Sequence, residues 1–286
     1  MIQYTGAYQR ELDVAIETAI LAGAAVRELY LAASAETYIK DDGSPVTDAD
    51  LAADRIIRQR LGEYFPGDAL LTEEGVDDAS RLTNRRVWIV DPIDGTQQFI
   101  DRTGEFDVVI ALAVDGKPVV GVLYQPTEDQ TLIAVEGGGA WVRRGDTTET
   151  FRFSAPFAPT RIYTSFYFGA PESLPLLGEL CAELGADGPG VSRWGVTPRE
   201  FMPSGRYDAL IGLYVPPRPT IAWEWDFAAP DLFMHEAGGH FTDLAGRRFR
   251  YNKPGGKNDG GLIMAKNGAT HRRVLDALEA RDLAQR

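Results

Sequence analysis

The sequence predicts an α/β protein, with elements of the α+β type, in which helices pack against β-sheets. Three patterns indicate this class: long segments with apolar residues at helical spacing, short apolar runs that end in acidic residues, and a set of apolar runs joined by short turns. The chain has 286 residues, of which 44% are hydrophobic and 25% charged. It therefore has enough apolar material for one large domain or two medium ones.

Two amphipathic helices are predicted at the start of the chain. Residues 8–33 carry apolar side chains at helical spacing, and the turn-forming stretch 41–45 then interrupts the pattern. Thr47 and Asp50 have the spacing of a capping box, in which a hydroxyl residue and an acid three positions later bond each other's backbone. An apolar helical face then continues to residue 64, so we expect Asp50 in the first turn of a helix.

Short apolar runs predict buried strands in the same half of the chain. The runs 69–72 and 87–90 each end in acid, the first in Glu73 and Glu74 and the second in Asp91. An antiparallel meander is predicted from three further runs with short turns between them, 108–114, 119–124 and 131–135.

The second half of the chain repeats this alternation less regularly. The predicted strands are 161–166, 207–214 and 261–265, and the predicted helices are 172–184, 228–237 and 271–283. We divide the chain at the irregular stretch 151–159. This gives an N-terminal α+β half, residues 1–150, and a C-terminal α/β half, residues 151–286.

Composition narrows the range of functions. A formal net charge of −13 argues against the binding of nucleic-acid polymers and of anionic membranes, because both are bound through clustered Lys and Arg. An anionic ligand is therefore expected to be small and to be bound with the help of a divalent cation. No stretch approaches the ~18 uninterrupted apolar residues of a membrane helix, and Cys181 has no second cysteine to pair with, so we expect a cytoplasmic protein.

A metal-binding loop is predicted where the second acidic run begins. Asp91 and Asp94 lie three residues apart across Pro92, and Gly95 then permits close approach of the backbone. Ligand sets made only of oxygen favour hard cations such as Mg²⁺, whereas three histidines and one cysteine are too scattered for a zinc site. A pair of acids on a turn can also be a simple solvated cap.

Three acids from other elements favour the metal site over the cap. Glu73 follows a strand, Asp50 begins a helix, and Asp226 precedes a helical segment of the second half. We expect all of them to converge with the loop at one end of a sheet, where α/β proteins bind ligands. If Gly95 and Thr96 open a helix, their amides can also receive a phosphate oxygen.

Five segments resemble, in order, the successive signatures of one family. They are GSPVTDAD at 43–50, TEEG at 72–75, WIVDPIDGT at 88–96, WDFAA at 225–229 and EAGG at 236–239. Together they span about residues 40–240 and are similar to the inositol monophosphatase superfamily. The resemblance implies a layered αβαβα sandwich of the inositol monophosphatase and fructose-1,6-bisphosphatase type. It also implies a Li⁺-sensitive phosphoric monoester hydrolase with two or three Mg²⁺ ions, and it is compatible with a homodimer.

By matching positions, the resemblance implies roles for individual residues. The implied ligands are Glu73, Asp91 and the Ile93 carbonyl for a first metal, and Asp91, Asp94 and Asp226 for a second. Glu73 and Thr96 would position the attacking water as catalytic residues, and Asp50 would lie close by, toward a third, weaker metal. Metal ions lower the pKa of bound water and stabilise the attacking and leaving oxygens, so the phosphate is released by in-line displacement without a covalent intermediate.

The substrate class depends on features outside this core. Three stretches resemble the 3′(2′),5′-bisphosphate nucleotidase branch: 99–106, 225–230, and 249–253 with 258–261. Gly212 stands where the inositol enzymes carry an acid, which removes an acceptor for a sugar hydroxyl. We therefore favour a small phosphorylated metabolite of the nucleoside bisphosphate type. The alternatives are inositol, sugar, polyol or histidinol phosphates, and, less favoured because all implied ligands and Thr96 are present, a binding protein without turnover.

Contacts to the substrate are expected from both halves of the chain. The candidates are Lys40, Asp94, Gly95, Thr96, Arg199 and Asp226. The stretch 215–220 is interpreted either as a stiff wall of the substrate site or as a surface loop. Arg193, Lys253 and Lys257 are either contacts to a second phosphate or solvated charges.

The remaining conspicuous side chains are expected to have structural roles. His235 and His240 lack partners at metal-ligand spacing, which favours packing. Trp223 and Trp225 flank the helix start that carries Asp226, and we expect them to buttress it rather than to stack on a base.

Overall fold

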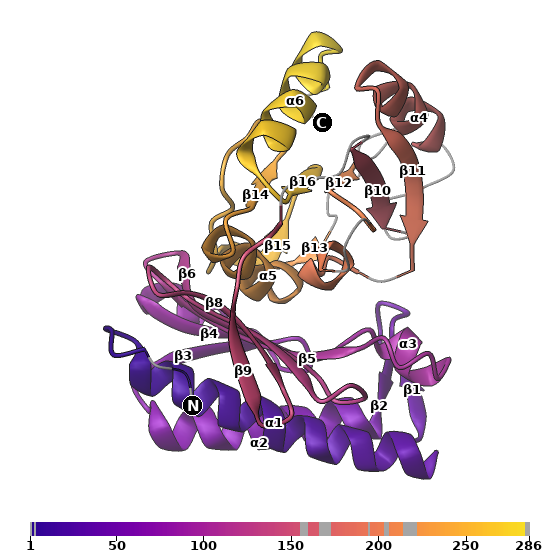
Figure 1. Cartoon of the computed structure of the whole chain (residues 1–286). Helices are drawn as coiled ribbons and strands as arrows, with labels where there is room; N and C mark the ends of the chain where they lie inside the picture. Colours follow the sequence, from indigo (N-terminus) through magenta and orange to yellow (C-terminus); the bar gives the residue numbers. More distant parts are fainter. Residues whose placement is uncertain are drawn as a thin grey trace. The chain divides into compact units, whose positions relative to one another are not determined.

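The chain forms two compact units in the computed structural model (Figure 1). The structure describes residues 2, 4–154, 160–165, 173–193, 195–202, 206–213 and 222–283. The first unit consists of Met1–Phe151, Glu224–Phe233 and Tyr251–Gly256, and the second of Arg152–Trp223, Met234–Arg250 and Lys257–Arg286. Asp226 thus belongs to the first unit, although it lies far along the C-terminal half of the sequence.

The first unit is built on a seven-stranded sheet with the order β3-β4-β5-β6-β7-β8-β9. Its strands are β3 (Ala69–Thr72), β4 (Arg86–Asp94), β5 (Asp107–Val114), β6 (Lys117–Gln125), β7 (Gln130–Val135), β8 (Gly139–Arg144) and β9 (Thr147–Phe151). β3 runs parallel to β4, and every other neighbouring pair is antiparallel. The predicted meander is therefore confirmed, and β8 and β9 extend it.

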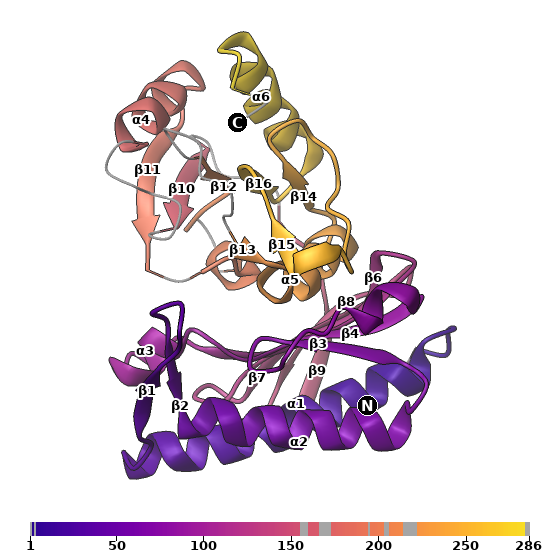
Figure 2. The ribbon, with the colours of Figure 1, turned by 180° about the vertical axis from the view of Figure 1, so that it is seen from behind.

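Helices α1 (Gln9–Ala32) and α2 (Asp48–Tyr64) lie along one face of this sheet (Figure 2). Leu12 and Val26 of α1 are buried in the same core as Ile110 and Val122 of the sheet. Burial of an aliphatic side chain of this size contributes ~1.5–3 kcal/mol. Both predicted helices are confirmed, and the capping box that begins α2 is formed as expected.

The other face of the sheet carries α5 (Glu224–Glu236), of which residues 224–233 belong to the first unit. Successive side chains of a strand point to opposite faces. In β6, the ring of Tyr124 lies where a side chain on Gly23 of α1 would have to go, whereas a Cβ on Gly121 would lie 3.2 Å from the backbone of Ala229 in α5. Gly121 therefore lets α5 approach the sheet closely, and the unit has three layers: helices, sheet, helix.

Short elements complete the first unit around its sheet. A hairpin of β1 (Thr37–Ile39) and β2 (Pro45–Thr47) occupies the stretch that the sequence marks as a break. α3 (Thr96–Ile100) follows β4 after the single residue Gly95, and the short helical turns η1 (Ser80–Thr83) and η3 (Pro254–Gly256) lie in connections.

The second unit contains a mixed five-stranded sheet with the order β11-β10-β12-β16-β14. Its strands are β10 (Arg161–Ser165), β11 (Asp187–Ser192), β12 (Ala209–Gly212), β14 (His240–Asp243) and β16 (Leu262–Ala265). Helices α4 (Leu174–Glu183) and α6 (Gly268–Ala280) share one apolar core with this sheet. A short pair of β13 (Ala222–Trp223) and β15 (Lys257–Asn258) and the turn η2 (Pro198–Phe201) complete the described part.

Two strands of this five-stranded sheet, β11 and β14, were not predicted. β11 reads DGPGVS and β14 reads HFTD, so neither shows the alternating or continuous apolar run by which strands are recognised. β11 lies at an edge of the sheet, where glycine and proline are tolerated. The predicted strand 207–214 falls partly on residues outside the described part.

The three histidines of the chain lie together in the second unit. The rings of His240 and His271 stack with centroids 4.9 Å apart, and the His235 ring lies 5.9 Å from that of His240. His235 Nε2 contacts the backbone of Phe241. The packing role expected for His235 and His240 agrees with these contacts.

We expect stability to fall as the pH drops through the range in which His271 would titrate. Burial lowers the pKa of His271 from 6.5 to about 4. At a pH between these two values, His271 binds a proton in the unfolded chain but not in the folded chain. The free energy of unfolding therefore decreases as the pH falls, by an amount on the order of 1–3 kcal/mol. The free energy of unfolding is measured with urea at about pH 7.5 and pH 4.5, for the unmodified chain and for His271→Gln. Glutamine keeps a hydrogen-bond donor toward Thr242. An equally steep pH dependence in that variant would contradict the assignment.

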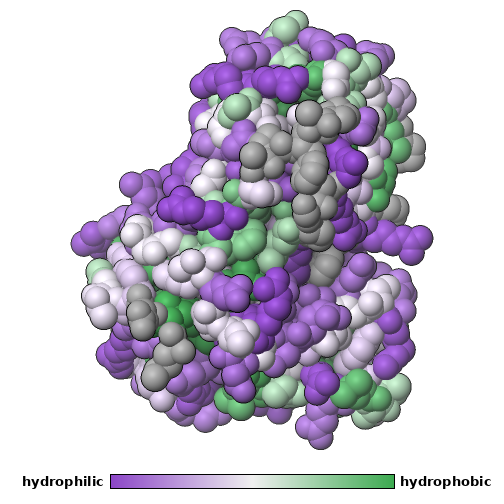
Figure 3. Space-filling model, in the orientation of Figure 1, coloured by the Kyte–Doolittle hydropathy of each residue, from purple (hydrophilic) through white to green (hydrophobic). Residues whose placement is uncertain are grey.

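No helix in the described part of the chain is long and apolar enough to cross a membrane. Figure 3 shows polar side chains spread over the visible face of both units.

Candidate metal centre

The predicted metal loop departs from regular strand geometry. β4 pairs with β5 at Asp91, opposite Val109, and again at Asp94, opposite Asp107, with an irregular register between them. In a regular strand, residues three apart point to opposite faces, whereas a bulge can turn both to the same side. The irregularity therefore lets Asp91 and Asp94 present their carboxylates to one place.

The strand extends further than the sequence predicts. The apolar run 87–90 predicts an end at Asp91, but β4 continues to Asp94. Pro92, which has no N–H to donate, falls in the irregular stretch where no residues of β5 are paired with it. The prediction was wrong because polar residues and a proline usually end a strand, and here the bulge accommodates both.

Asp226 joins these two carboxylates from the first turn of α5. One oxygen from each of Asp91, Asp94 and Asp226 lies within 4.8 Å of the others. Asp91 is 2% exposed, and its Oδ1 accepts the backbone N–H of Ile93 at 3.0 Å. The loop and a distant helix thus place three acids at one point.

Asp91 is buried and Asp94 and Asp226 are half-buried, and this partial burial penalises the negative charge of the cluster. Burial raises the pKa of Asp91 well above its usual value, and the charges of Glu73, Asp94 and Asp226 raise it further. Burial also raises the pKa of Asp94, as do the charges of Asp226 and Asp107. Like charges this close are stabilised by a proton or by a cation.

Glu73 is delivered to the same region by β3. Its N–H donates to Val90 O at 3.1 Å, next to Asp91. The Glu73 carboxylate is held by Lys40 Nζ at 2.7 Å, and the same Nζ contacts Glu74 Oε1 at 3.0 Å. Burial opposes the charge on Lys40, but the two glutamates outweigh it and raise the pKa of Lys40. Lys40, predicted to contact the substrate, is thus engaged with a predicted metal ligand.

Thr96 connects the loop to the start of α2. Its Oγ1 lies 3.0 Å from Asp50 Oδ1 and 3.2 Å from Ile93 O, and its single hydroxyl proton can serve one acceptor at a time. Asp50 is 1% exposed, and its Oδ2 accepts from the backbone N–H of Thr47 at 2.8 Å. Burial raises the pKa of Asp50, which the hydrogen bonds from Thr47 and Thr96 partly offset.

Gly95 makes the turn between β4 and α3. It has a φ of +104°, and a Cβ there would lie 2.9 Å from Glu105 O. The expectation that Gly95 and Thr96 open a helix is met by α3, although this helix has only five residues.

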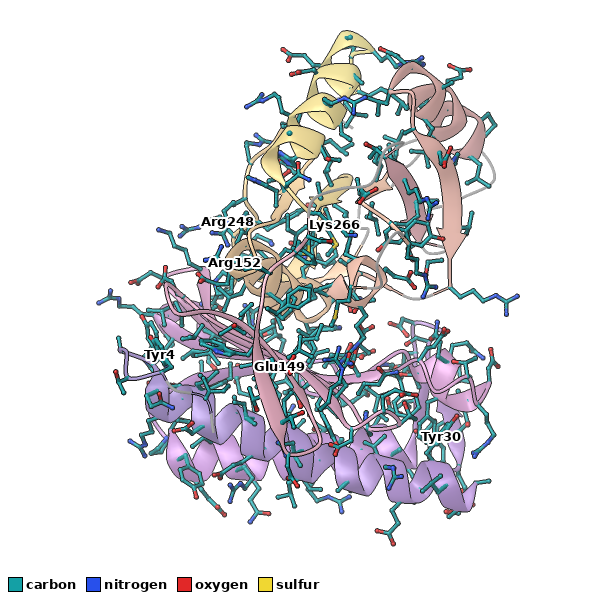
Figure 4. All side chains as sticks on the ribbon, in the orientation of Figure 1. Tyr4, Tyr30, Glu149, Arg152, Arg248 and Lys266 are labelled. Atoms are coloured by element: carbon teal, nitrogen blue, oxygen red, sulfur yellow. The ribbon has the colours of Figure 1, made fainter. Side chains whose placement is uncertain are left out.

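A cluster of three aromatic rings holds α3 against the end of α1. The ring of Phe99 lies 5.4 Å from that of Tyr30 and 5.3 Å from that of Phe106. Tyr30 lies near the end of α1 (Figure 4). The Arg102 guanidinium lies over the Tyr30 ring, 4.4 Å from its centroid, and its Nη1 donates to the Tyr30 carbonyl. The loop is thus anchored to the end of α1 by ring packing and a cation–π contact.

Two acids of the site were missed by the sequence analysis. The Glu74 side chain is 4% exposed, and burial followed by the charge of Glu73 raises its pKa to about 7. Asp107 is fully buried and lies opposite Asp94 in the sheet. The sequence carries a signal for each of them: Glu74 is next to Glu73, and Asp107 comes directly before the predicted strand 108–114.

The structure places the other predicted substrate contacts as follows. Arg199 belongs to the second unit, where it is buried in η2. Lys253 forms an ion pair, with its Nζ 3.2 Å from Glu224, and its side chain is half-buried. Lys257 lies over the Trp223 ring at 4.6 Å. The stretch 215–220 lies outside the described residues.

The chain matches the model of the inositol monophosphatase family over residues 8–282. It is 30% identical to the 3′(2′),5′-bisphosphate nucleotidase CysQ of Aggregatibacter actinomycetemcomitans over 253 residues, which cover 85% of this chain and 87% of that protein. It is also 30% identical to a histidinol-phosphatase of Chlorobaculum parvum over 271 residues, 94% of this chain and 96% of that protein.

A solved structure agrees with these matches. CysQ from Bacteroides thetaiotaomicron, described as a bacterial member of the inositol monophosphatase family, has a TM-score of 0.74 and 28% identity, covering 91% of this chain and 99% of that chain. The predicted α/β fold of the inositol monophosphatase type is thereby confirmed. The chain belongs to the inositol monophosphatase family.

Proposed function

We propose that the chain hydrolyses the phosphate monoester of a small metabolite, with Mg²⁺ bound by Asp91, Asp94 and Asp226 and with Glu73 beside them. The observation that carries this proposal is the convergence of three carboxylate oxygens within 4.8 Å. Nowhere else among the described residues do three potential ligands come so close. An all-oxygen set suits a hard cation, and a divalent ion offsets the repulsion that raises the pKa of Asp91 and Asp94.

The chain's own residues are suited to orient an attacking water. Bound Mg²⁺ supplies a lowered pKa for water and charge stabilisation for phosphoryl oxygens. When Thr96 donates its proton to Asp50, 3.0 Å away, the lone pairs of Oγ1 remain to accept from a water. Glu73 offers a second acceptor, which Lys40 holds in place. A water that donates to both directs its own lone pair away from them, toward the phosphorus.

The start of α3 completes the proposed phosphate site. We assign the amides of Gly95 and Thr96 to a phosphoryl oxygen, because Gly95 keeps this stretch of backbone free of a side chain. Lys40 and Arg199 stay predictions as substrate contacts.

The leaving alcohol is proposed to be a nucleoside that carries a second phosphate. This choice is supported by the likeness of 99–106 and 225–230 to the bisphosphate nucleotidase branch and by Gly212 in place of an acid. Identity alone does not discriminate, because the nucleotidase CysQ and a histidinol-phosphatase are both 30% identical to this chain. Histidinol, inositol and sugar phosphates are therefore the alternatives.

Phosphate release by the pure protein tests both levels of the proposal. We expect release that needs Mg²⁺ and stops with EDTA, and the highest kcat/KM on adenosine 3′,5′-bisphosphate among a panel that includes histidinol phosphate, inositol 1-phosphate and fructose 1,6-bisphosphate. A preference for another ester would replace the substrate and keep the reaction. Absence of release from every ester would remove the reaction itself.

The cytoplasmic location, the homodimer and inhibition by Li⁺ stay predictions. Gel filtration with light scattering measures the oligomeric state, and Li⁺ titration of the same assay measures the inhibition.

A further inference from the structure

A chain of polar contacts links the turn after Glu73 to the first turn of α5. It passes through Asp77, Arg81, the segment 252–253 and Glu224, all within the first unit. Its two ends lie close in sequence to two carboxylates of the metal centre: Asp77 comes four residues after Glu73, and Glu224 two residues before Asp226. We name this chain of contacts the Arg81 strut.

Arg81 is the centre of the strut and is only 3% exposed. Its Nε and Nη2 donate to the two carboxylate oxygens of Asp77 at 3.0 and 2.7 Å. Its Nη1 donates to Asn252 Oδ1 at 2.8 Å, and its Nη2 also donates to Lys253 O at 3.0 Å. Every guanidinium nitrogen is used, so the planar group fixes the segment 252–253 in both position and orientation.

Glu224 forms the other end of the strut and is fully buried. Its carboxylate accepts the backbone N–H groups of Asn252 at 2.7 Å and Lys253 at 2.9 Å, and Lys253 Nζ lies 3.2 Å away. Asn252 has a φ of +61° and donates its side-chain amide to the carbonyls of Arg81 and Asn84. A buried charge with these partners holds the first residue of α5 on this segment.

The metal centre needs such a restraint. One carboxylate oxygen each of Asp91, Asp94 and Asp226 lies within 4.8 Å of the others, and like charges at this distance repel one another. Asp226 comes from a helix distant in sequence, so local backbone geometry cannot hold it against this repulsion. A helix start fixed through Glu224 can, because the two residues share one helical turn.

We propose that Arg81 is a positioning residue of the metal centre: through the segment 252–253 and Glu224 it holds the Asp226 carboxylate in place before the metal binds. The metal in this inference rests on the proposed function, but the positioning can be measured without any metal. Loss of the strut should weaken metal binding because part of the binding free energy would then be spent on ordering Asp226.

Arg81→Gln tests the strut, with Arg86→Gln as the matched control. Arg86, at the start of β4, also binds one aspartate through two nitrogens, at 2.7 and 3.0 Å to Asp68, and it contacts Glu11. It belongs to the same unit but does not join the strut. A purely structural effect should therefore appear in both variants.

Hydrogen exchange of the metal-free protein is the first readout. In α5 the amides of Ala228 and Ala229 bond to the carbonyls of Glu224 and Trp225, so they report on the first turn. We expect these amides to exchange at least about tenfold faster in Arg81→Gln than in Arg86→Gln. Equal rates in the two variants would overturn the positioning role.

Mg²⁺ calorimetry is the second readout. We expect Kd to rise by about 10-fold or more in Arg81→Gln and to change little in Arg86→Gln. In an Asp226→Ala background Arg81→Gln should have no further effect, because the residue through which it acts is gone. If the exchange rates differ while the unmodified chain binds no Mg²⁺, the proposed function fails and the positioning stands. If Mg²⁺ binds and neither readout separates the two arginines, the positioning fails and the function stands.

Discussion

Asp91→Asn is expected to lower kcat/KM by at least about three orders of magnitude and to leave the fold intact. The substitution keeps the shape of the side chain and an oxygen that accepts the Ile93 N–H at 3.0 Å. It removes one negative charge from the centre of the three-carboxylate cluster. Metal affinity should therefore collapse, whereas the repulsion that raises the pKa of Asp94 should be relieved.

The two consequences can be separated by thermal melts. In EDTA, Asp91→Asn should melt at the temperature of the unmodified chain or above it. With Mg²⁺, only the unmodified chain should gain stability, because ligand binding to the folded state raises the melting temperature. Asp146→Asn, an exposed change between β8 and β9, serves as the control and should behave like the unmodified chain. Near-normal turnover by a folded Asp91→Asn protein would show that this carboxylate is not a metal ligand.

Gly95→Ala is expected to reduce kcat/KM by about 100-fold or more and to destabilise the fold by ~1–3 kcal/mol. A methyl group there would meet Glu105 O at 2.9 Å and Phe106 Cβ at 3.2 Å, and the φ of +104° is unfavourable for any residue with a Cβ. Neither neighbour can move freely, because both belong to the backbone segment that leads into β5. Relief must come from a shift of Thr96 and α3, which carry the proposed water and phosphate contacts.

Gly137→Ala separates strain from displacement. Gly137 also has a positive φ, +67°, but a Cβ there would meet nothing within 4 Å. It should lose stability only through the backbone conformation and keep its turnover, as measured by urea unfolding and phosphate release. If both variants lose the same stability and neither loses turnover, the close approach at Gly95 has no role in the site.

The reaction class was accessible from the sequence because its signals are local. The acids of the metal loop follow an apolar run, and the capping box predicts the helix that begins with Asp50 in its first turn. The order of five segments indicated the family that the comparisons confirm. The predicted class, a phosphoric monoester hydrolase, is confirmed by that membership. The roles of individual ligands stay predictions until they are tested as above.

What escaped the sequence depends on contacts between distant segments. Arg81 and Asn252 are 171 positions apart, and nothing in either neighbourhood indicates that they meet. Lys40 was expected at the substrate, and its ion pairs with Glu73 and Glu74 require the hairpin of β1 and β2, which forms on a stretch read only as a break. β11 and β14 were missed because short strands take their stability from sheet neighbours rather than from an apolar pattern.

The membership of residues 224–233 in the first unit has a consequence for biosynthesis. During translation, residues 1–151 leave the ribosome before the segment 224–233, which supplies most of α5 and the carboxylate of Asp226. Until then the sheet face next to Gly121 lacks its helix, and the apolar strands of β4 to β7 stand exposed on that side. Exposed apolar surface promotes aggregation, so the packing of α5 on the sheet both protects the nascent chain and brings Asp226 to Asp91 and Asp94.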